Sequence, residues 1–339
     1  MKSWQLSILA ILFICLVFIY FAGQRQQREK CPDIFVSILP NFENQGPDSL
    51  KAYWRGSKDK GLVIKKTKDG WLVSVKKEGK KFWTYAKSQK VEKLLHDLSS
   101  LTGQLRADDR RYLDDFGLGE NQGLQIVLER SGSRLASLVV GKKGPGWGSC
   151  FVKKADSSKV YLVSKDILAD FDIWSKQMDS PIEIRPWIEL TLIKETPFEI
   201  NEVEYKSGKI HWSLKRGQQK QESKWQLNIG KKSQVIDGNR AQEILSRLFP
   251  MRATKPLPKD EFRIKDKAKE EDVLTVKDKN GTLHLLYLPP CNEKEQICLV
   301  KDEKGYVFNI AKDIKKDLDE PKKLIKEEDK KGKTFQQKR

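Results

Sequence analysis

Ser149–Ile167, SCFVKKADSSKVYLVSKDI, occurs a second time in this chain of 339 residues. The second copy is Ile297–Ile314, ICLVKDEKGYVFNIAKDI, and a one-residue gap aligns Cys150 with Cys298 as well as the Lys-Asp-Ile that ends each copy. The similarity extends upstream at nearly the same offset. A chain of this length has room for two domains, so the duplication predicts two units of one architecture.

The residues around the first copy predict a hairpin, a helix and a meander. Gly61–Lys66 and Trp71–Val75 are short apolar runs on either side of Asp69-Gly70, which is a strong hairpin signal. Ser88–Leu101 carries apolar residues at helical spacing, which predicts an amphipathic helix. Four short runs rich in β-forming residues predict an antiparallel meander. They are Leu124–Glu129, Leu135–Val140, Cys150–Lys153 and Val160–Val163.

The second half of the chain repeats this order. Lys209–Lys215 and Trp225–Ile229 predict the hairpin, and Asn239–Phe249 predicts the helix, which Pro250 ends. The second meander is predicted over Asp272–Val276, Leu283–Leu288, Ile297–Val300 and Val307–Ile310. The predicted core residues of the two repeats are Trp71, Leu94, Leu98, Trp225, Leu245 and Leu248. We therefore expect an α+β fold of two tandem repeats, each an antiparallel sheet with one packed helix, after a single N-terminal transmembrane helix.

The N-terminal part is predicted to contain a membrane segment. Residues 6–22, LSILAILFICLVFIYFA, form an uncharged apolar run that would make ~25 Å of helix, close to the ~30 Å of a hydrocarbon core. A cleaved signal peptide and an uncleaved anchor are the two interpretations. The run exceeds the ~7–15 apolar residues of a signal peptide, and no small-x-small cleavage site follows it, which favours the anchor.

Two opposing arguments bear on the orientation of this anchor in the membrane. Arg25, Arg28 and Lys30 after the run favour a cytoplasmic C-terminal side, but long domains translocate largely regardless of charge. A single anchor before a long soluble part is a common way to hold an extracytoplasmic domain at a membrane. We expect a single-pass protein of the cytoplasmic (inner) membrane whose soluble part is periplasmic or extracellular.

The predicted domain boundaries follow from these elements. The ranges are 1–30 for the anchor and its basic flank, 31–47 for a connector, 48–180 for the first repeat, 181–196 for a linker, 197–318 for the second repeat and 319–339 for a tail. The tail is rich in Lys and Glu without apolar periodicity, which predicts disorder.

The formal net charge of +18 predicts attraction to anionic partners such as lipid head groups or acidic envelope polymers. The alternative is that Lys serves only as a solvated surface residue, and its spread along both repeats supports this. Nucleic-acid binding is disfavoured, because the basic residues are mostly Lys and no base-stacking motif interrupts them.

No pattern predicts a catalytic, cofactor-binding or metal-binding residue. Gly141–Gly148, GKKGPGWG, is similar to a phosphate-binding loop, but it lies between two predicted strands and no helix follows, so we expect a hairpin loop. The histidines are not at metal-ligand spacing; they are His96, His211 and His284. The acidic pairs Asp108-Asp109 and Asp114-Asp115 alternate with arginines, which is typical of surface ion pairs.

Cys291 and Cys298 are the closest cysteine pair and flank a predicted turn between strands. If this part of the chain is outside the cytoplasm, we expect a disulfide across the hairpin. The alternative is a buried thiol, since Cys150, the counterpart of Cys298, has no second cysteine in its own loop.

The combined pattern resembles the bacterial domain of unknown function 4340 family. It is carried by the membrane helix, the strand pair with Trp71, the helix VEKLLHDLSSL, the segment Phe116-Gly117-Leu118 and the strand end Val140-Gly141, and it spans residues 48–315. The second repeat departs from it, with Pro289 in place of Gly141. The resemblance implies tandem units in a membrane-anchored envelope protein, often associated with ABC transporters, and it provides no catalytic residues.

We therefore expect a non-enzymatic scaffold or accessory subunit that contacts an ABC-type transporter or another envelope protein. One alternative is an envelope hydrolase acting on glycan or lipid, which would need Asp114 or Asp115 in a pocket with His96. Another is a basic protein that binds an anionic polymer or nucleic acid, whose binding would depend steeply on salt.

Overall fold

The computed structural model describes residues 35–39, 46–57, 60–174, 181–217, 224–262, 272–291 and 298–321. The predicted membrane anchor, and residues 322–339 of the predicted tail, lie outside these ranges. Among the residues described, no helix combines the length and apolarity needed to span a bilayer.

The fold is α+β and mostly β, with two ten-stranded antiparallel sheets and few helices in the described part of the chain. The first sheet follows the order β1 (Phe35–Ser37), β6 (Thr102–Ala107), β10 (Val160–Val163), β9 (Cys150–Lys154), β8 (Ser133–Lys143), β7 (Leu124–Arg130), β2 (Ser49–Trp54), β3 (Leu62–Thr67), β4 (Gly70–Lys77) and β5 (Lys80–Tyr85). The predicted hairpin is β3–β4, and the predicted meander is β7 to β10.

The second sheet has the same topology, with every strand number raised by ten. Its order is β11 (Thr191–Ile193), β16 (Met251–Leu257), β20 (Val307–Ile310), β19 (Cys298–Asp302), β18 (Leu283–Tyr287), β17 (Val273–Asp278), β12 (Ile200–Ser207), β13 (Ile210–Arg216), β14 (Trp225–Ile229) and β15 (Lys232–Ile236). The shared strand order agrees with the duplication that the sequence predicts.

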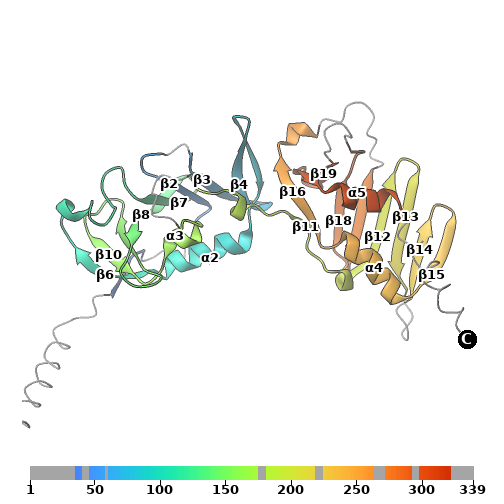
Figure 1. Ribbon diagram of the computed structural model, residues 1–339, viewed down its shortest axis with the longest axis horizontal. Coiled ribbons are helices and arrows are strands. Elements are labelled where there is room, and N and C mark those ends of the chain that lie inside the picture. Colours follow the sequence, from blue (N-terminus) through green and yellow to red (C-terminus); the bar gives the residue numbers. More distant parts are fainter. Residues whose placement is uncertain are drawn as a thin grey trace, which may run out of the picture. The chain divides into compact units, whose positions relative to one another are not determined.

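The predicted helices are α2 (Ser88–Ser99) and α4 (Gly238–Leu248), one with each sheet (Figure 1). Asp237 caps α4, because its carboxylate accepts the backbone N–H of Arg240 at 2.9 Å. The apolar face of α4 is buried in the core of the second sheet, and each of its larger side chains contributes ~1.5–3 kcal/mol by leaving water. All six predicted core residues, Trp71, Leu94, Leu98, Trp225, Leu245 and Leu248, are buried.

The prediction of one helix per repeat was incomplete. A further helix begins at each copy of Lys-Asp-Ile: α3 (Ile167–Asp170) in the first and α5 (Lys312–Asp319) in the second. Asp166 caps α3 by accepting the N–H of Ala169 at 3.3 Å. The repeated motif therefore marks a helix start that follows the last strand of each meander.

The predicted linker 181–196 is structured rather than a plain connection. It contains the short 3-10 helix η3 (Arg185–Trp187), whose Trp187 is fully buried, and the strand β11, which pairs with β16. β1, in the predicted connector 31–47, pairs with β6 in the same way. Each connection thus supplies the edge strand of the sheet that follows it.

The chain separates into two compact units that do not coincide with the predicted ranges 48–180 and 197–318. One comprises residues 1–63 and 92–183, and the other comprises residues 64–91 and 184–339. Within the second unit, Leu72 belongs to the apolar cluster that contains Trp212 and Trp225. Tyr85 donates a hydrogen bond to Asp302 Oδ2 at 2.6 Å. These contacts explain why residues 64–91 group with the second sheet.

In the first unit, the segment Phe116-Gly117-Leu118 lies against the strand end at Gly141. Lys142 N–H donates to Phe116 O at 2.8 Å, and Leu118 is fully buried. A Cβ on Gly141 would lie 2.2 Å from Phe116 O and 2.9 Å from Leu118 Cγ. The Phe116-Gly117-Leu118 segment and the strand end at Gly141 therefore pack directly against each other.

Replacing Gly141 with alanine is expected to destabilise the first unit by about 1–3 kcal/mol, because the clashing Phe116 oxygen belongs to the backbone and cannot rotate away. Urea unfolding with hydrogen exchange at Leu138–Val140 would measure this effect. Gly146→Ala is the matched control, since its Cβ would meet nothing closer than Ser149 Oγ at 3.6 Å. Equal stability of the two variants would contradict the packing argument.

Candidate functional site

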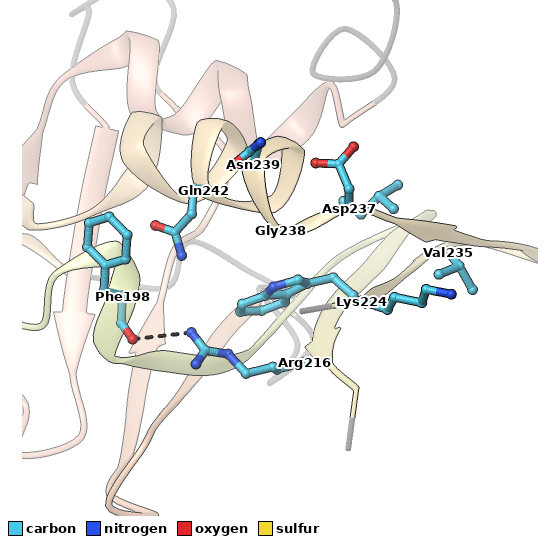
Figure 2. Close-up of a pocket in the computed structure, with 10 residues that line it drawn as sticks. Phe198, Arg216, Lys224, Val235, Asp237, Gly238, Asn239 and Gln242 are labelled. Atoms are coloured by element: carbon cyan, nitrogen blue, oxygen red, sulfur yellow. Dashed lines mark hydrogen bonds between the residues drawn. The ribbon is translucent and has the colours of Figure 1, made fainter. Parts of the chain in front are cut away.

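The candidate site is a pocket of about 680 Å³ in the second unit, between the first turn of α4 and the ends of β13 to β15. Figure 2 shows Gln242 and Asn239 projecting from α4 and Arg216 reaching across from β13. Phe198, in the 3-10 helix η4 (Pro197–Glu199), closes one side, and Val235 of β15 borders the other. Phe198 and Val235 are 74% and 68% exposed, so the rim offers apolar surface to solvent.

Arg216 organises the floor of this pocket. Its guanidinium lies 4.9 Å from the ring centre of the buried Trp225, a cation–π contact. Its Nη2 donates to Phe198 O at 3.2 Å and to Ile200 O at 3.3 Å, as Figure 2 shows for Phe198. The positive charge is therefore fixed in position by two carbonyls without being neutralised by them.

Two polar atoms in the wall of the pocket are shielded from solvent and have no hydrogen-bond partner. They are Arg216 Nε and Gln242 Oε1. The other end of the Gln242 amide donates to Pro197 O at 3.3 Å, which fixes its orientation. An unpaired buried polar atom costs about 1–3 kcal/mol, so keeping one donor and one acceptor here is typical of a binding site rather than of a packed core.

The strand β15 forms the open edge of the second sheet beside this pocket. Its burial pattern is exposed at the first four residues and half-buried at Ile236. The β14–β15 turn has two residues, Gly230 and Lys231, and Gly230 has φ +56°. The closing pair of a two-residue hairpin is hydrogen-bonded, so Ser233 and Val235 direct their backbone N–H and C=O away from β14. This edge can pair with a further strand.

The residues that the sequence singled out lie elsewhere. Gly141–Gly148 forms the end of β8 and the connection to β9, and Asp114 and Asp115 are exposed. Lys142 Nζ donates to the backbone carbonyl of Asp115 at 3.0 Å. His96 and His211 are exposed. The pocket was missed because most of its lining residues, among them Phe198, Arg216 and Val235, lie outside the predicted elements, and only Trp225 was predicted to be important.

The disulfide pair is formed in the structure. Cys291 and Cys298 are bonded, with their Cα atoms 4.3 Å apart. Cys150, the counterpart of Cys298, is a fully buried thiol that donates to Lys165 O at 3.1 Å. Burial raises the pKa of Cys150 to about 12, so its thiol stays protonated and unreactive at neutral pH. The equivalent strand position thus has a structural role in both repeats.

The comparison with known families settles the resemblance. The model of the family described as Domain of unknown function (DUF4340) matches residues 86–272. The chain belongs to the DUF4340 family. The DUF4340 match begins directly after β5 and ends directly before β17, so it includes the Phe116–Leu118 contact with Gly141 and every residue that lines the pocket under α4. No curated protein and no solved structure matches the chain.

Proposed function

We propose that this DUF4340 protein is a non-catalytic docking protein of the cell envelope. Residues 6–22 hold it in the cytoplasmic membrane, and its two sheets are periplasmic or extracellular. There, β15 and the pocket beside it bind an extended acidic segment of a partner protein, an ABC-type transporter component or another envelope protein. The observation that carries the proposal is the exposed edge of β15 beside a pocket with a fixed positive charge.

The backbone of β15 supports an extended polypeptide as the ligand. An added strand would satisfy the outward N–H and C=O groups of Ser233 and Val235, which is the usual basis of affinity in β-strand addition. The neighbouring pocket would then receive a side chain of that strand against Phe198 and Trp225.

Charge supports an acidic segment. Arg216 and Lys224 line the pocket, and Lys231 and Lys232 are exposed at the start of the edge strand. The carboxylate of Asp237 is engaged in capping α4. With a chain net charge of +18, an acidic partner would be attracted both at long range and at the site itself. An anionic lipid or polymer would also be attracted by the net charge, but it could not pair as a strand with the backbone N–H and C=O groups of β15.

Localisation rests on the predicted anchor and on the Cys291–Cys298 bond, since disulfides persist in oxidising compartments. The transporter as a partner rests on the family resemblance alone. The hydrolase alternative has less support, because Asp114, Asp115 and His96 are exposed and line neither the pocket under α4 nor two further cavities of the second unit.

A proline at Val235 is expected to weaken partner binding by about tenfold or more. Proline removes an outward N–H and blocks an incoming strand without breaking a bond to β14, and each lost backbone hydrogen bond is worth about 0.5–1.5 kcal/mol. Crosslinking with mass spectrometry on native membranes, comparing wild type, Val235→Pro and Val235→Thr, measures this effect. Val235→Thr is the matched control, because it keeps the N–H.

The two parts of the proposal can fail separately. If external protease does not cleave the protein in intact spheroplasts, the assigned topology is wrong. If the same proteins crosslink equally to wild type and to Val235→Pro, β15 is not the docking edge. Crosslinks confined to glycan-processing proteins would favour the hydrolase alternative.

A further inference from the structure

Three potential metal ligands from separate elements converge in the second unit. Glu195 lies between β11 and η4, Asp278 ends β17, and His284 lies on β18. One ligand atom from each side chain lies within 4.8 Å of those of the other two. Asp278 and His284 lie on either side of the turn between β17 and β18, and Glu195 lies on the segment that leads from β11 to β12.

Two of these side chains carry polar atoms that are buried and unpaired. His284 Nε2 lies 3.3 Å from Glu195 Oε1, yet His284 Nε2 and Glu195 Oε2 have no hydrogen-bond partner and are shielded from solvent. The protein itself supplies no hydrogen-bond partner that satisfies these two atoms. A positively charged ion that accepts lone pairs from both would do so.

Asp278 is held in place as a third ligand. It is buried, and its Oδ1 accepts the backbone N–H of Asn280 at 2.8 Å and of Thr282 at 2.7 Å. Hydrogen bonds of this kind orient a ligating carboxylate before the metal arrives. The turn at Asn280-Gly281 therefore also positions the carboxylate.

The separation of His284 and Glu195 fits tetrahedral coordination of a transition metal. Two ligands that are each ~2.1 Å from zinc at tetrahedral angles are ~3.4 Å apart, and Nε2 and Oε1 are 3.3 Å apart. One imidazole and two carboxylates suit Zn²⁺ better than Ca²⁺ or Mg²⁺, which prefer oxygen ligands alone. His284 also lines a cavity of about 260 Å³, whereas Glu195 and Asp278 do not.

We propose that Glu195, Asp278 and His284 bind one divalent transition-metal ion of the zinc type, with a fourth position open to water or to a ligand group. The ion would tie the connection after β11 to the β17–β18 hairpin. This site is independent of β15, because its three residues line no part of the pocket under α4.

The competing explanation is a charged His284 that forms an ion pair with Glu195. The chain supplies a matched example of that arrangement in His211 and Glu204. Their side chains form a hydrogen bond at 3.0 Å, and His211 is exposed. Glu204 also pairs with Lys206 at 2.7 Å, so a lysine lies beside this histidine–glutamate pair. His211 is therefore a histidine–glutamate control without the proposed metal set.

The test uses the full chain, purified in detergent, stripped of metal with a chelator and titrated with Zn²⁺ by calorimetry. We expect one ion per chain and a rise in melting temperature on binding. His284→Gln and Glu195→Gln should each weaken Zn²⁺ binding by at least about 10–100-fold. Asp278→Asn should do the same while keeping an oxygen for the turn, and His211→Gln should leave binding unchanged.

Substitution with Co²⁺ gives a second measurement, because tetrahedral cobalt has intense visible absorption that a misfolded variant or a surface ion would not reproduce. Its loss in Glu195→Gln, with an unchanged circular dichroism spectrum, would support the site. The proposal would be overturned if the wild type bound no stoichiometric Zn²⁺. It would also be overturned if His284→Gln bound Zn²⁺ as tightly as the wild type and the His211→Gln control.

Discussion

Truncating Trp212 to alanine is expected to destabilise the second unit by about 3–5 kcal/mol, the largest loss of stability that we expect from a single substitution in this chain. Trp212 lies on β13, is 1% exposed and pairs across the sheet with Tyr205, whose ring centre is 6.3 Å away. Its indole Nε1–H donates to Leu318 O in α5 at 2.9 Å. The alanine variant loses the buried ring and leaves that carbonyl without its donor.

Urea unfolding followed by hydrogen exchange in β12 and β13 would measure the loss. Trp147→Ala is the control, because Trp147 is fully exposed and its removal should change stability by no more than about 0.5 kcal/mol. Trp212→Phe separates the two contributions, since it keeps most of the ring and removes only the hydrogen bond. If Trp147→Ala and Trp212→Ala had equal effects, Trp212 would not attach α5 to the sheet.

The elements that could be predicted from the sequence are those whose signal is local. Asp69-Gly70 predicted a hairpin, and Gly70 has φ +103°, which favours glycine at this turn. The apolar spacing before Pro250 predicted α4, and the duplicated meander strands were found from their β-forming residues. In each case, the residues that form the sequence pattern also form the turn, helix or strand that the pattern predicts.

The elements that could not be predicted depend on exposure or on distant contacts. β15, KSQVI, is almost entirely exposed, so it lacks the alternation of buried and solvated residues that reveals a strand. Glu195 and His284 come together because the chain that carries Glu195 leads into β12, which pairs with β17, and β17 pairs with β18. The histidines therefore showed no metal-ligand spacing. The Lys-Asp-Ile repeat was a usable signal for α5, but it was interpreted as part of the strand motif.

The helix α5 also carries a buried charge whose removal gives the second largest expected effect. Lys315 is 2% exposed, and its Nζ donates to Tyr205 Oη at 2.7 Å and to Asp319 Oδ1 and Oδ2 at 2.7 and 2.8 Å. Tyr205 in turn donates to Asp319 Oδ1 at 2.6 Å. Burial and the adjacent Asp319 carboxylate raise the pKa of Tyr205 above its usual range, so the phenol keeps its proton and remains a donor.

Replacing Asp319 with alanine is expected to cost about 3 kcal/mol, because it leaves a buried ammonium without its counter-charge. Lys315→Met should cost less, since Asp319 is one-third exposed and water can replace its lost partner. The double variant Lys315→Met/Asp319→Leu should recover part of the Asp319→Ala loss, because no unpaired charge remains. A double-mutant cycle in urea unfolding measures all three.

The first unit supplies the control for this cycle. Lys93 and Asp97 have the same i,i+4 spacing on α2 and are 2.8 Å apart, but the Lys93 side chain is 66% exposed. Lys93→Met should therefore change stability by no more than about 0.5 kcal/mol. If Asp319→Ala were no worse than Lys93→Met, water would have to reach Lys315 in the folded state. α5 would then be held on the sheet by Trp212 and its apolar face alone.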